Sequence, residues 1–284
     1  MPKLLIPALA ALAASAVAGV AYAANVYTVD GDTKPRAKGA LKKPKPVALK
    51  FSYTVADDNP ANRGVPVKQY RIGAEGLMTY PRAFPSCSGG ESGANHPDPS
   101  TAAKRCRKAR LGGGTIKALV GARNSPTSSS NCVLKLSLYN LKPGHYGEAG
   151  RIRRTGGLAI RIDGDPPAPP SLDDRYRGEC LAAQHAAILA PYKTVRIRGR
   201  KSSELRFTVP PELLHPAQGL DVTVRDVTST IKRIVSKKRI RIKGKKRKVG
   251  FYSAVGCTGR KRSIQVTFVS EAGQKSSVRR DKRC

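Results

Sequence analysis

Residues 134–139 read LKLSLY, so apolar and polar side chains alternate strictly along this stretch. The same alternation recurs at 205–209, 222–225 and 264–268. Because successive side chains of a β-strand point to opposite faces of a sheet, a period of two places the apolar set in a core and the polar set in water. Segments rich in Gly, Pro and Ser separate these stretches, which is typical of antiparallel sheets. The sequence predicts an all-β fold, an antiparallel β-sandwich of about 11–13 strands.

One short helix is expected beside these strands. It covers residues 101–111, with Asp98 or Ser100 as its cap and the glycines at 112–114 as its end. A single helical turn is expected at 210–215.

Other segments complete the predicted sandwich. Residues 180–190 are rich in alanine and fit a helix or a strand equally well. Residues 270–274 carry the signal of a hairpin turn. Further strands are expected at 24–30, 47–55 and 67–72.

The chain opens with a segment typical of a secretory signal peptide. Lys3 supplies a positive charge, residues 4–20 carry none, and Ala21 and Ala23 provide the small residues that a signal peptidase accepts. We therefore expect residues 1–23 to be cleaved after Ala23. A retained membrane anchor is the alternative, although the apolar run is at the short limit for crossing a bilayer.

The remaining chain is expected to form one main domain. Residues 24–46 would be an N-terminal strand followed by a basic, Pro-rich linker at 31–46. Residues 47–284 would be the β-sandwich domain. A division near residues 165–178 is the alternative, because a Pro-rich stretch there favours a stiff, extended joint.

All six cysteines lie in the part expected to be exported. An even number of cysteines in an exported chain indicates disulfides, whereas the absence of a C-x-x-C motif speaks against zinc. The sequence alone does not choose among the many pairings. Our hypothesis is pairing in sequence order, which closes three local loops: Cys87 with Cys106, Cys132 with Cys180, and Cys257 with Cys284.

The composition is strongly basic. The formal net charge is +34, and the expected signal peptide carries only one of these charges. A charge of this size favours anionic partners. Tryptophan is absent and aromatic residues make up 5% of the chain, which argues against the stacked sugar sites of lectins.

The densest basic stretch is residues 232–248, in which eleven of seventeen residues are Lys or Arg. With Gly244 in a turn, this stretch would form a basic β-finger that binds anionic polymers and releases their counterions. The alternative is a solvated loop that only keeps the protein soluble. The predicted anion-binding residues are Lys232, Arg233, Lys237, Lys238, Arg239, Arg241, Lys243, Lys245, Lys246, Arg247 and Lys248.

A second basic pattern is apolar residues alternating with Arg or Lys, at 152–153, 160–162, 195–198 and 240–243. In a sheet, the apolar residues would face the core and the basic residues would face water. The pattern predicts a broad basic face on the sandwich.

No motif identifies an enzyme or a cofactor. The patterns H-E-x-x-H and G-x-S-x-G are absent. His145 and Glu148 have an H-x-x-E spacing, but on a Gly-rich loop, and the Asp-Gly-Asp at 163–165 is better explained as a turn. We expect no catalytic residues, no metal and no cofactor.

Several short stretches carry a resemblance to other proteins: NVYTV at 25–29, LLHP at 213–216, VTSTIK at 227–232, YSAVGC at 252–257 and IQVTF at 264–268. In these the chain resembles a group of uncharacterised exported proteins of high-GC actinobacteria. The resemblance implies secretion and a β-rich fold, and it implies no activity or functional residue.

Three hypotheses about function follow. The first is a non-catalytic, secreted or cell-wall-associated protein that binds an anionic wall polymer or acidic polysaccharide through the basic face and finger. The second is a structural or adhesive surface protein whose charge serves solubility. The third is a secreted hydrolase. Specific binding of nucleic acid is not expected, since no aromatic residues are interleaved with the basic run, and no membrane-spanning segment is expected after the signal.

Overall fold

The computed structural model describes residues 25–146, 151–153, 155–164, 180 and 184–284. The expected signal peptide at 1–23 and the expected division near 165–178 lie outside these residues. Strands from both sides of residues 165–178 share one continuous antiparallel sheet, which contains thirteen strands.

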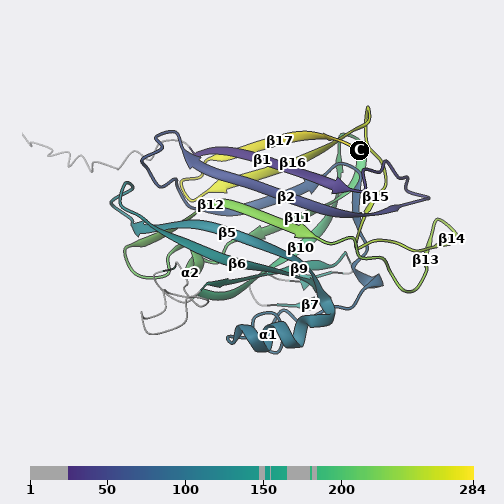
Figure 1. Ribbon diagram of the computed structural model, residues 1–284, viewed down its shortest axis with the longest axis horizontal. Coiled ribbons are helices and arrows are strands. Elements are labelled where there is room, and N and C mark those ends of the chain that lie inside the picture. Colours follow the sequence, from purple (N-terminus) through teal and green to yellow (C-terminus); the bar gives the residue numbers. More distant parts are fainter. Residues whose placement is uncertain (1–24, 147–150, 154, 165–179, 181–183) are drawn as a thin grey trace, which may run out of the picture.

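This sheet folds over on itself into two layers, as Figure 1 shows. One layer contains, in hydrogen-bonded order, β1 (Asn25–Lys34), β2 (Lys45–Asp57), β12 (Leu220–Ile231), β5 (Arg110–Ala122) and β6 (Ser130–Leu141). The other contains β10 (Gln184–Ile197), β11 (Arg200–Thr208), β3 (Val67–Ala74), β16 (Lys261–Ser270) and β17 (Lys275–Arg283). The connection between them is β9 (Gly157–Gly164), which pairs with both β6 and β10.

The remaining elements are short. The sheet extends beyond β2 through β15 (Tyr252–Ala254) and β4 (Leu77–Thr79). Two separate hairpins pair β7 (Gly144–His145) with β8 (Arg151–Ile152), and β13 (Ile240–Ile242) with β14 (Lys245–Arg247). The helices are α1 (Pro99–Cys106), α2 (Pro211–Leu214) and two 3-10 turns, η1 (Pro81–Ala83) and η2 (Arg107–Ala109).

Aromatic contacts join the two layers at the edge away from β9. The rings of Tyr27 on β1 and Phe268 on β16 stack with their centroids 4.3 Å apart. Tyr53 on β2 also contacts both Phe268 and Tyr70. At the surface of the same edge, the ammonium of Lys282 lies 2.7 Å from the carboxylate of Asp30. The layers therefore enclose a core that is covered at both sides.

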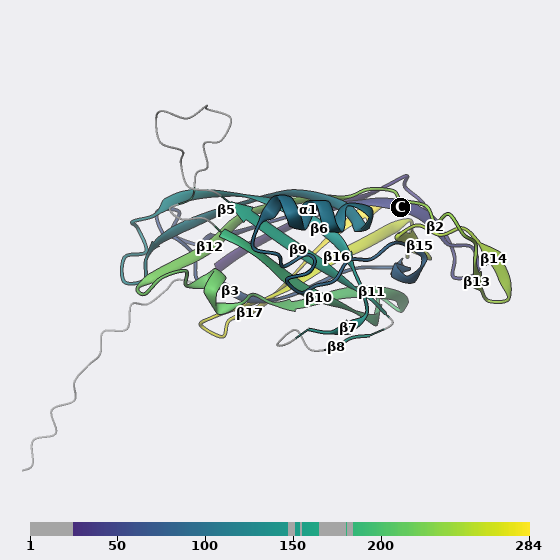
Figure 2. The same ribbon diagram turned by 90° about the horizontal axis from the view of Figure 1, so that it is seen from below.

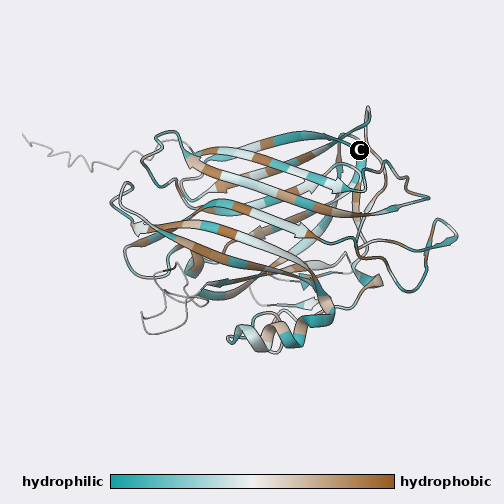
Figure 3. Ribbon diagram, in the orientation of Figure 1, coloured by the Kyte–Doolittle hydropathy of each residue, from teal (hydrophilic) through white to brown (hydrophobic). Residues whose placement is uncertain are grey.

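The fold class predicted from alternation is confirmed. Every alternating stretch is a strand, and hydrophilic and hydrophobic positions alternate along the sheet in Figure 3. The hairpin turn at 270–274 connects β16 and β17, and the ambiguous residues 184–190 are a strand. On β12 a bulge between Val224 and Asp226 shifts the register, so Val222 and Val227 both face inward.

The expected helix exists, but its predicted end was wrong. α1 begins at Pro99, with the Asp98 carboxylate accepting hydrogen bonds from the Ser100 and Thr101 amides. The helix ends at Cys106, and the glycines at 112–114 belong to β5. A Cβ atom on Gly114 would lie 1.8 Å from the carbonyl oxygen of Thr228. These glycines allow a close approach of strands and do not terminate the helix.

The linker predicted at residues 31–46 is shorter than expected. Gly31 to Lys34 continue β1, which pairs with β2 along its whole length, and Lys45 and Pro46 begin β2. The turn between these strands is held by backbone hydrogen bonds between Ala40 and Lys43. The prolines and lysines thus form a hairpin connection.

Arg161 contradicts the prediction that the basic residues of this pattern face water. Its side chain is 1% exposed, because residues 84–109 cover the outer face of β6 and β9. The guanidinium donates to the carbonyl oxygens of Ala94 and His96, and it pairs with Asp163 at 2.8 Å. By contrast, Arg153, Arg196 and Arg198 are exposed, as expected.

The three predicted disulfides are all present: Cys87–Cys106, Cys132–Cys180 and Cys257–Cys284. Cys106 lies at the end of α1, so its disulfide holds this helix against the loop that begins at Cys87. Disulfides of this kind persist in an oxidising environment outside the cytoplasm. Within the part of the chain that the structure describes, no helix is long and apolar enough to cross a membrane.

A buried arginine ties the N-terminal strand to the rest of the sheet. Arg262 on β16 is 1% exposed, and it donates to Thr33 Oγ1 and to the carbonyl oxygens of Glu75, Ala37 and Gly256. Burial lowers the pKa of Arg262 to about 10, against the opposing effect of the buried Glu75 carboxylate, so the guanidinium stays charged at neutral pH.

Replacing this arginine is expected to destabilise the fold. Arg262→Met would leave the Glu75 carboxylate buried beside an apolar side chain, which should lower the free energy of unfolding by about 3 kcal/mol. Urea unfolding measures the difference. The matched control is Arg71→Met on the adjacent strand β3, where the arginine is exposed. Equal stability of the two variants would contradict the structural role of Arg262.

Candidate functional site: a projecting basic finger

The basic stretch at 232–248 forms a finger that projects from one end of the molecule, as Figures 1 and 2 show. Its outer part is the hairpin β13–β14, in which Ile240 pairs with Arg247 and Ile242 with Lys245. Lys243 and Gly244 form the turn with φ angles of +46° and +83°. Positive φ at both central positions is typical of the tight turns that connect two strands, and glycine adopts this angle without strain.

The Lys232 amide donates to the carbonyl of Leu111 on β5, and further backbone hydrogen bonds join the two sides of the finger at its base. The Ser236 amide donates to the carbonyl of Val249, and the Phe251 amide donates to the carbonyl of Ile234. The Val249 amide in turn donates to the Ser236 hydroxyl at 3.1 Å. Ser236, Val249 and Phe251 are buried. The finger is therefore an ordered extension of the sandwich, and these buried residues at its base set its direction.

The predicted anion-binding residues are brought together as the sequence suggested. Ten of the eleven basic side chains are exposed, and Arg247 is partly buried with its Nε atom lacking a hydrogen-bond partner. Among the described residues, no carboxylate forms an ion pair with any of the eleven. The far end of the hairpin is hydrophilic in Figure 3. The finger thus presents positive charge that nothing within the described fold neutralises.

Like charges face each other within the hairpin. Arg241 pairs directly across from Lys246. Side chains at such opposed positions are close neighbours, and like charges there destabilise a pair of strands. An anion bound between them would relieve this repulsion.

Sequence reasoning missed a second source of positive charge at the base of the finger. Gly39 bridges to Val255, and Lys45 pairs with Ala254, so the β1–β2 connection lies against the segment that follows the finger. Arg233 Nε also donates to the Pro46 carbonyl at 3.3 Å. This connection carries exposed cations that were assigned to a linker: Lys38, Lys42, Lys43 and Lys45.

A groove of about 480 Å³ adjoins the finger on another side. Ile240 of the finger lies on its wall, together with Met78, Tyr80, Arg82 and Lys193. Arg82 and Lys193 are exposed or partly exposed cations that the sequence pattern did not single out. Only the folding of the chain places them beside residues 240–247.

The other motifs found in the sequence do not assemble a catalytic or metal site. His145 lies exposed on β7, and Glu148 and Asp165 lie outside the described residues. A further S-x-x-K spacing runs from Ser229 on β12 to Lys232, which directly follows the end of this strand, and residues three apart in extended backbone point to opposite faces. Within the described ranges, no group of three or more His, Cys, Asp or Glu is positioned to hold a metal ion.

A polar cluster around His215 lies beyond α2. Its Nδ1 is 2.9 Å from the Asp221 carboxylate, and its Nε2 is 2.8 Å from that of Glu271. Arg123 contacts both Asp221 and the ring, and the buried Arg63 lies 4.0 Å from Asp221. Desolvation opposes charge on His215, but hydrogen bonds to Glu271 and Asp221 outweigh it and raise its pKa.

This cluster predicts a pH-dependent contribution to stability. A histidine whose pKa is raised by folding contributes stability that is complete below its unfolded pKa of about 6.5 and is lost as pH rises through the folded pKa. The urea midpoint of the wild type should therefore exceed that of His215→Gln most at about pH 5.5, and the difference should shrink by about pH 8.5. His145→Gln, at an exposed position, is the control and should show no such trend. A difference that grew with pH would contradict the assignment.

Comparisons with protein-family models, with curated proteins and with solved structures give no match for this chain.

Proposed function

We propose that this is a non-catalytic protein of the cell exterior that binds anionic polymers through the finger at 232–248 and the cations around its base. The observation that carries the proposal is a set of eleven basic side chains held on an ordered finger without any ion pair among the described residues. A loop that served only solubility would not need to be fixed at its base, whereas the buried Ser236 and Val249 hold the finger in place.

Electrostatics explains how such a finger binds. A polymer with regularly spaced phosphates or carboxylates carries condensed counterions, and each contact with Lys or Arg releases some of them. Opposed cations such as Arg241 and Lys246 lose their mutual repulsion when an anion lies between them. The hairpin lacks aromatic side chains, so the binding is to the charged groups of the polymer.

The proposed place of action is outside the cell, and the partner is a phosphate-rich wall polymer or an acidic polysaccharide. The signal peptide expected at 1–23 supports export. Three disulfides are consistent with an oxidising compartment. Binding to the wall would retain the protein at the cell surface.

Neutralising the finger tests the proposal. In the oxidised protein spanning residues 24–284, the four lysines of the tip would be changed to Gln: Lys243, Lys245, Lys246 and Lys248. Retention on immobilised polyglycerol phosphate, alginate and duplex DNA would then be measured across a salt series. The variant should bind at least about tenfold more weakly to one polymer near 0.15 M salt, with a shallower salt dependence, since fewer counterions are released.

A matched control separates the finger from net charge. It removes four cations from α1 and the turn after it, which lie on a different part of the surface (Figure 1). The control variant carries Lys104→Gln, Arg105→Gln, Arg107→Gln and Lys108→Gln. Its binding to the polymers should stay close to that of the wild type. If the two variants lost binding equally, the finger would be rejected as a binding site and a structural role would be favoured. The same conclusion would follow if the wild type lost retention on all three polymers by physiological salt.

A further inference from the structure

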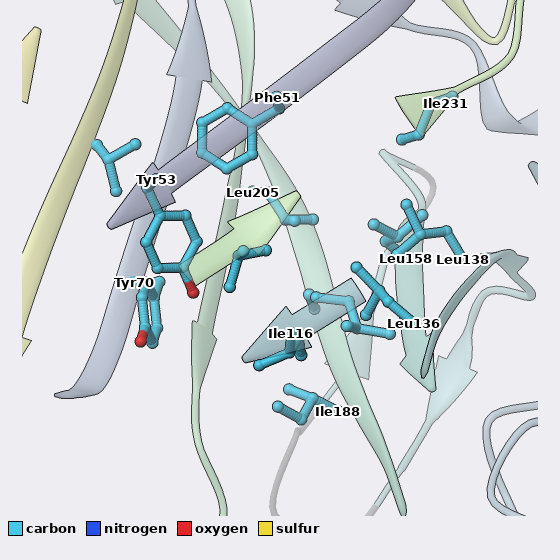
Figure 4. Close-up of a cluster of buried hydrophobic side chains, with 14 of the residues drawn as sticks. Phe51, Tyr53, Tyr70, Ile116, Leu136, Leu138, Leu158, Ile188, Leu205 and Ile231 are labelled. Carbon is cyan, nitrogen blue, oxygen red and sulfur yellow. The ribbon is translucent and has the colours of Figure 1, made fainter. Parts of the chain in front are cut away.

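The two layers of the sheet enclose a cavity of about 210 Å³. Side chains from both layers line it, including Phe51, Ile116, Leu136 and Leu205. Figure 4 shows labelled side chains from both layers directed toward this shared interior. Among the described residues that line the cavity, none is charged, although the protein carries a net charge of +34.

Few polar side chains lie in the wall, namely Gln184, Ser229 and the tyrosines, and several of their hydroxyls already have partners within the protein. Tyr252 contacts the Tyr192 hydroxyl at 2.8 Å, and the Ser229 hydroxyl donates to the Phe51 carbonyl at 3.3 Å. An apolar cavity on the order of 150 Å³ is known to stay dry and to bind small apolar molecules. This cavity is larger and its wall is mostly apolar, so it suits an apolar ligand.

The cavity extends along the length of β12. Its wall follows β12 from Leu220 to Ile231, which spans roughly 36 Å at the usual rise per strand residue. A volume of about 210 Å³ spread along such a wall leaves room for a single chain and excludes a bulky ring system. The shape therefore favours an unbranched hydrocarbon.

One end of the cavity lies beside α2. Val209, Leu213 and Val222 line the cavity there and are only partly buried. Leu214 and Pro216 also line this end, while His215 between them is held by Asp221 and Glu271. Polar contacts thus position an apolar segment at this end of the cavity.

We propose that this cavity binds one long, unbranched acyl chain, either as a free fatty acid or as part of a phospholipid. The acyl chain would lie along β12 between the layers, with its polar end at α2. The site is separate from the finger, so the proposal does not depend on the function proposed above.

Direct binding tests this inference. The oxidised, delipidated protein spanning residues 24–284 would be titrated with the fluorescent fatty acid cis-parinaric acid, followed by displacement with palmitic acid or with uncharged cetyl alcohol. Saturable binding of one molecule, displaced by both chains and not by the bulky adamantane carboxylate, is the expected result. Absence of saturable binding, or displacement by anions alone, would overturn the proposal.

Variants locate the bound chain. Val222→Phe combined with Val224→Phe would fill the cavity and should weaken binding at least about tenfold, as expected when a ring occupies the space of the ligand. Thr230→Phe adds the same ring to an exposed position of β12 and should bind like the wild type. Equal binding by the cavity-filled and wild-type proteins would overturn the proposal. If the cavity-filled protein fails to fold, the displacement series with the wild type still tests whether the protein binds an acyl chain.

Two further arms complete the experiment. Native mass spectrometry after incubation with palmitic acid, or with phosphatidylglycerol vesicles, distinguishes a bound fatty acid from a bound phospholipid by its mass. The finger variant with its four lysines changed to Gln should retain acyl-chain binding. Loss of binding in that variant would show that the fatty acid is held by surface charge, which would overturn the cavity proposal while leaving the finger intact.

Discussion

The pairing of β9 with both β6 and β10 is the interaction on which the rest of the structure depends. These two ladders of hydrogen bonds make one sheet out of the two layers. Seven of the eight residues of β9 are buried, which means that both faces of this strand are covered. The inner face contributes to the core and cavity, and the outer face is covered by residues 84–109. Because hydrogen-bonded strands are held at a fixed spacing, β9 sets how the apolar faces of the two layers meet.

A sandwich with this charge must keep its cations away from its core. The structure does so by exposing most of them and by giving the few buried arginines specific partners. Arg262 donates to carbonyl oxygens near the N-terminal strand, and Arg161 to those of the loop that covers β9. Arg63 donates to the carbonyl oxygens of Ala122 and Ser128 at the end of β5 and in the loop after it. These arginines are buried and bonded to partners within the fold, whereas the finger cations form no ion pair with a carboxylate of the described residues, and ten of the eleven are exposed. Burial thus distinguishes the arginines that stabilise the fold from the exposed cations that we propose bind anions.

Much of the fold follows from local sequence, because alternation and turn residues act over a few positions. The strands, α1 and all three disulfides were predictable at this level. What was not predictable depends on distant segments. Arg161 is buried because residues far along the chain cover it, and Gly114 is required by the backbone of a strand more than a hundred residues away. The finger was visible as a run of charge, but the lysines of the β1–β2 connection join it only through pairing with β15.

The disulfide between Cys257 and Cys284 has a mechanical consequence. It encloses the whole β16–β17 hairpin in a covalent loop, since β16 and β17 both lie between these two cysteines. A pulling force applied at Cys284 therefore passes directly to Cys257 and does not unzip β17 from β16. The load instead reaches the segment next to β15, which is paired in the interior of the sheet between β2 and β4.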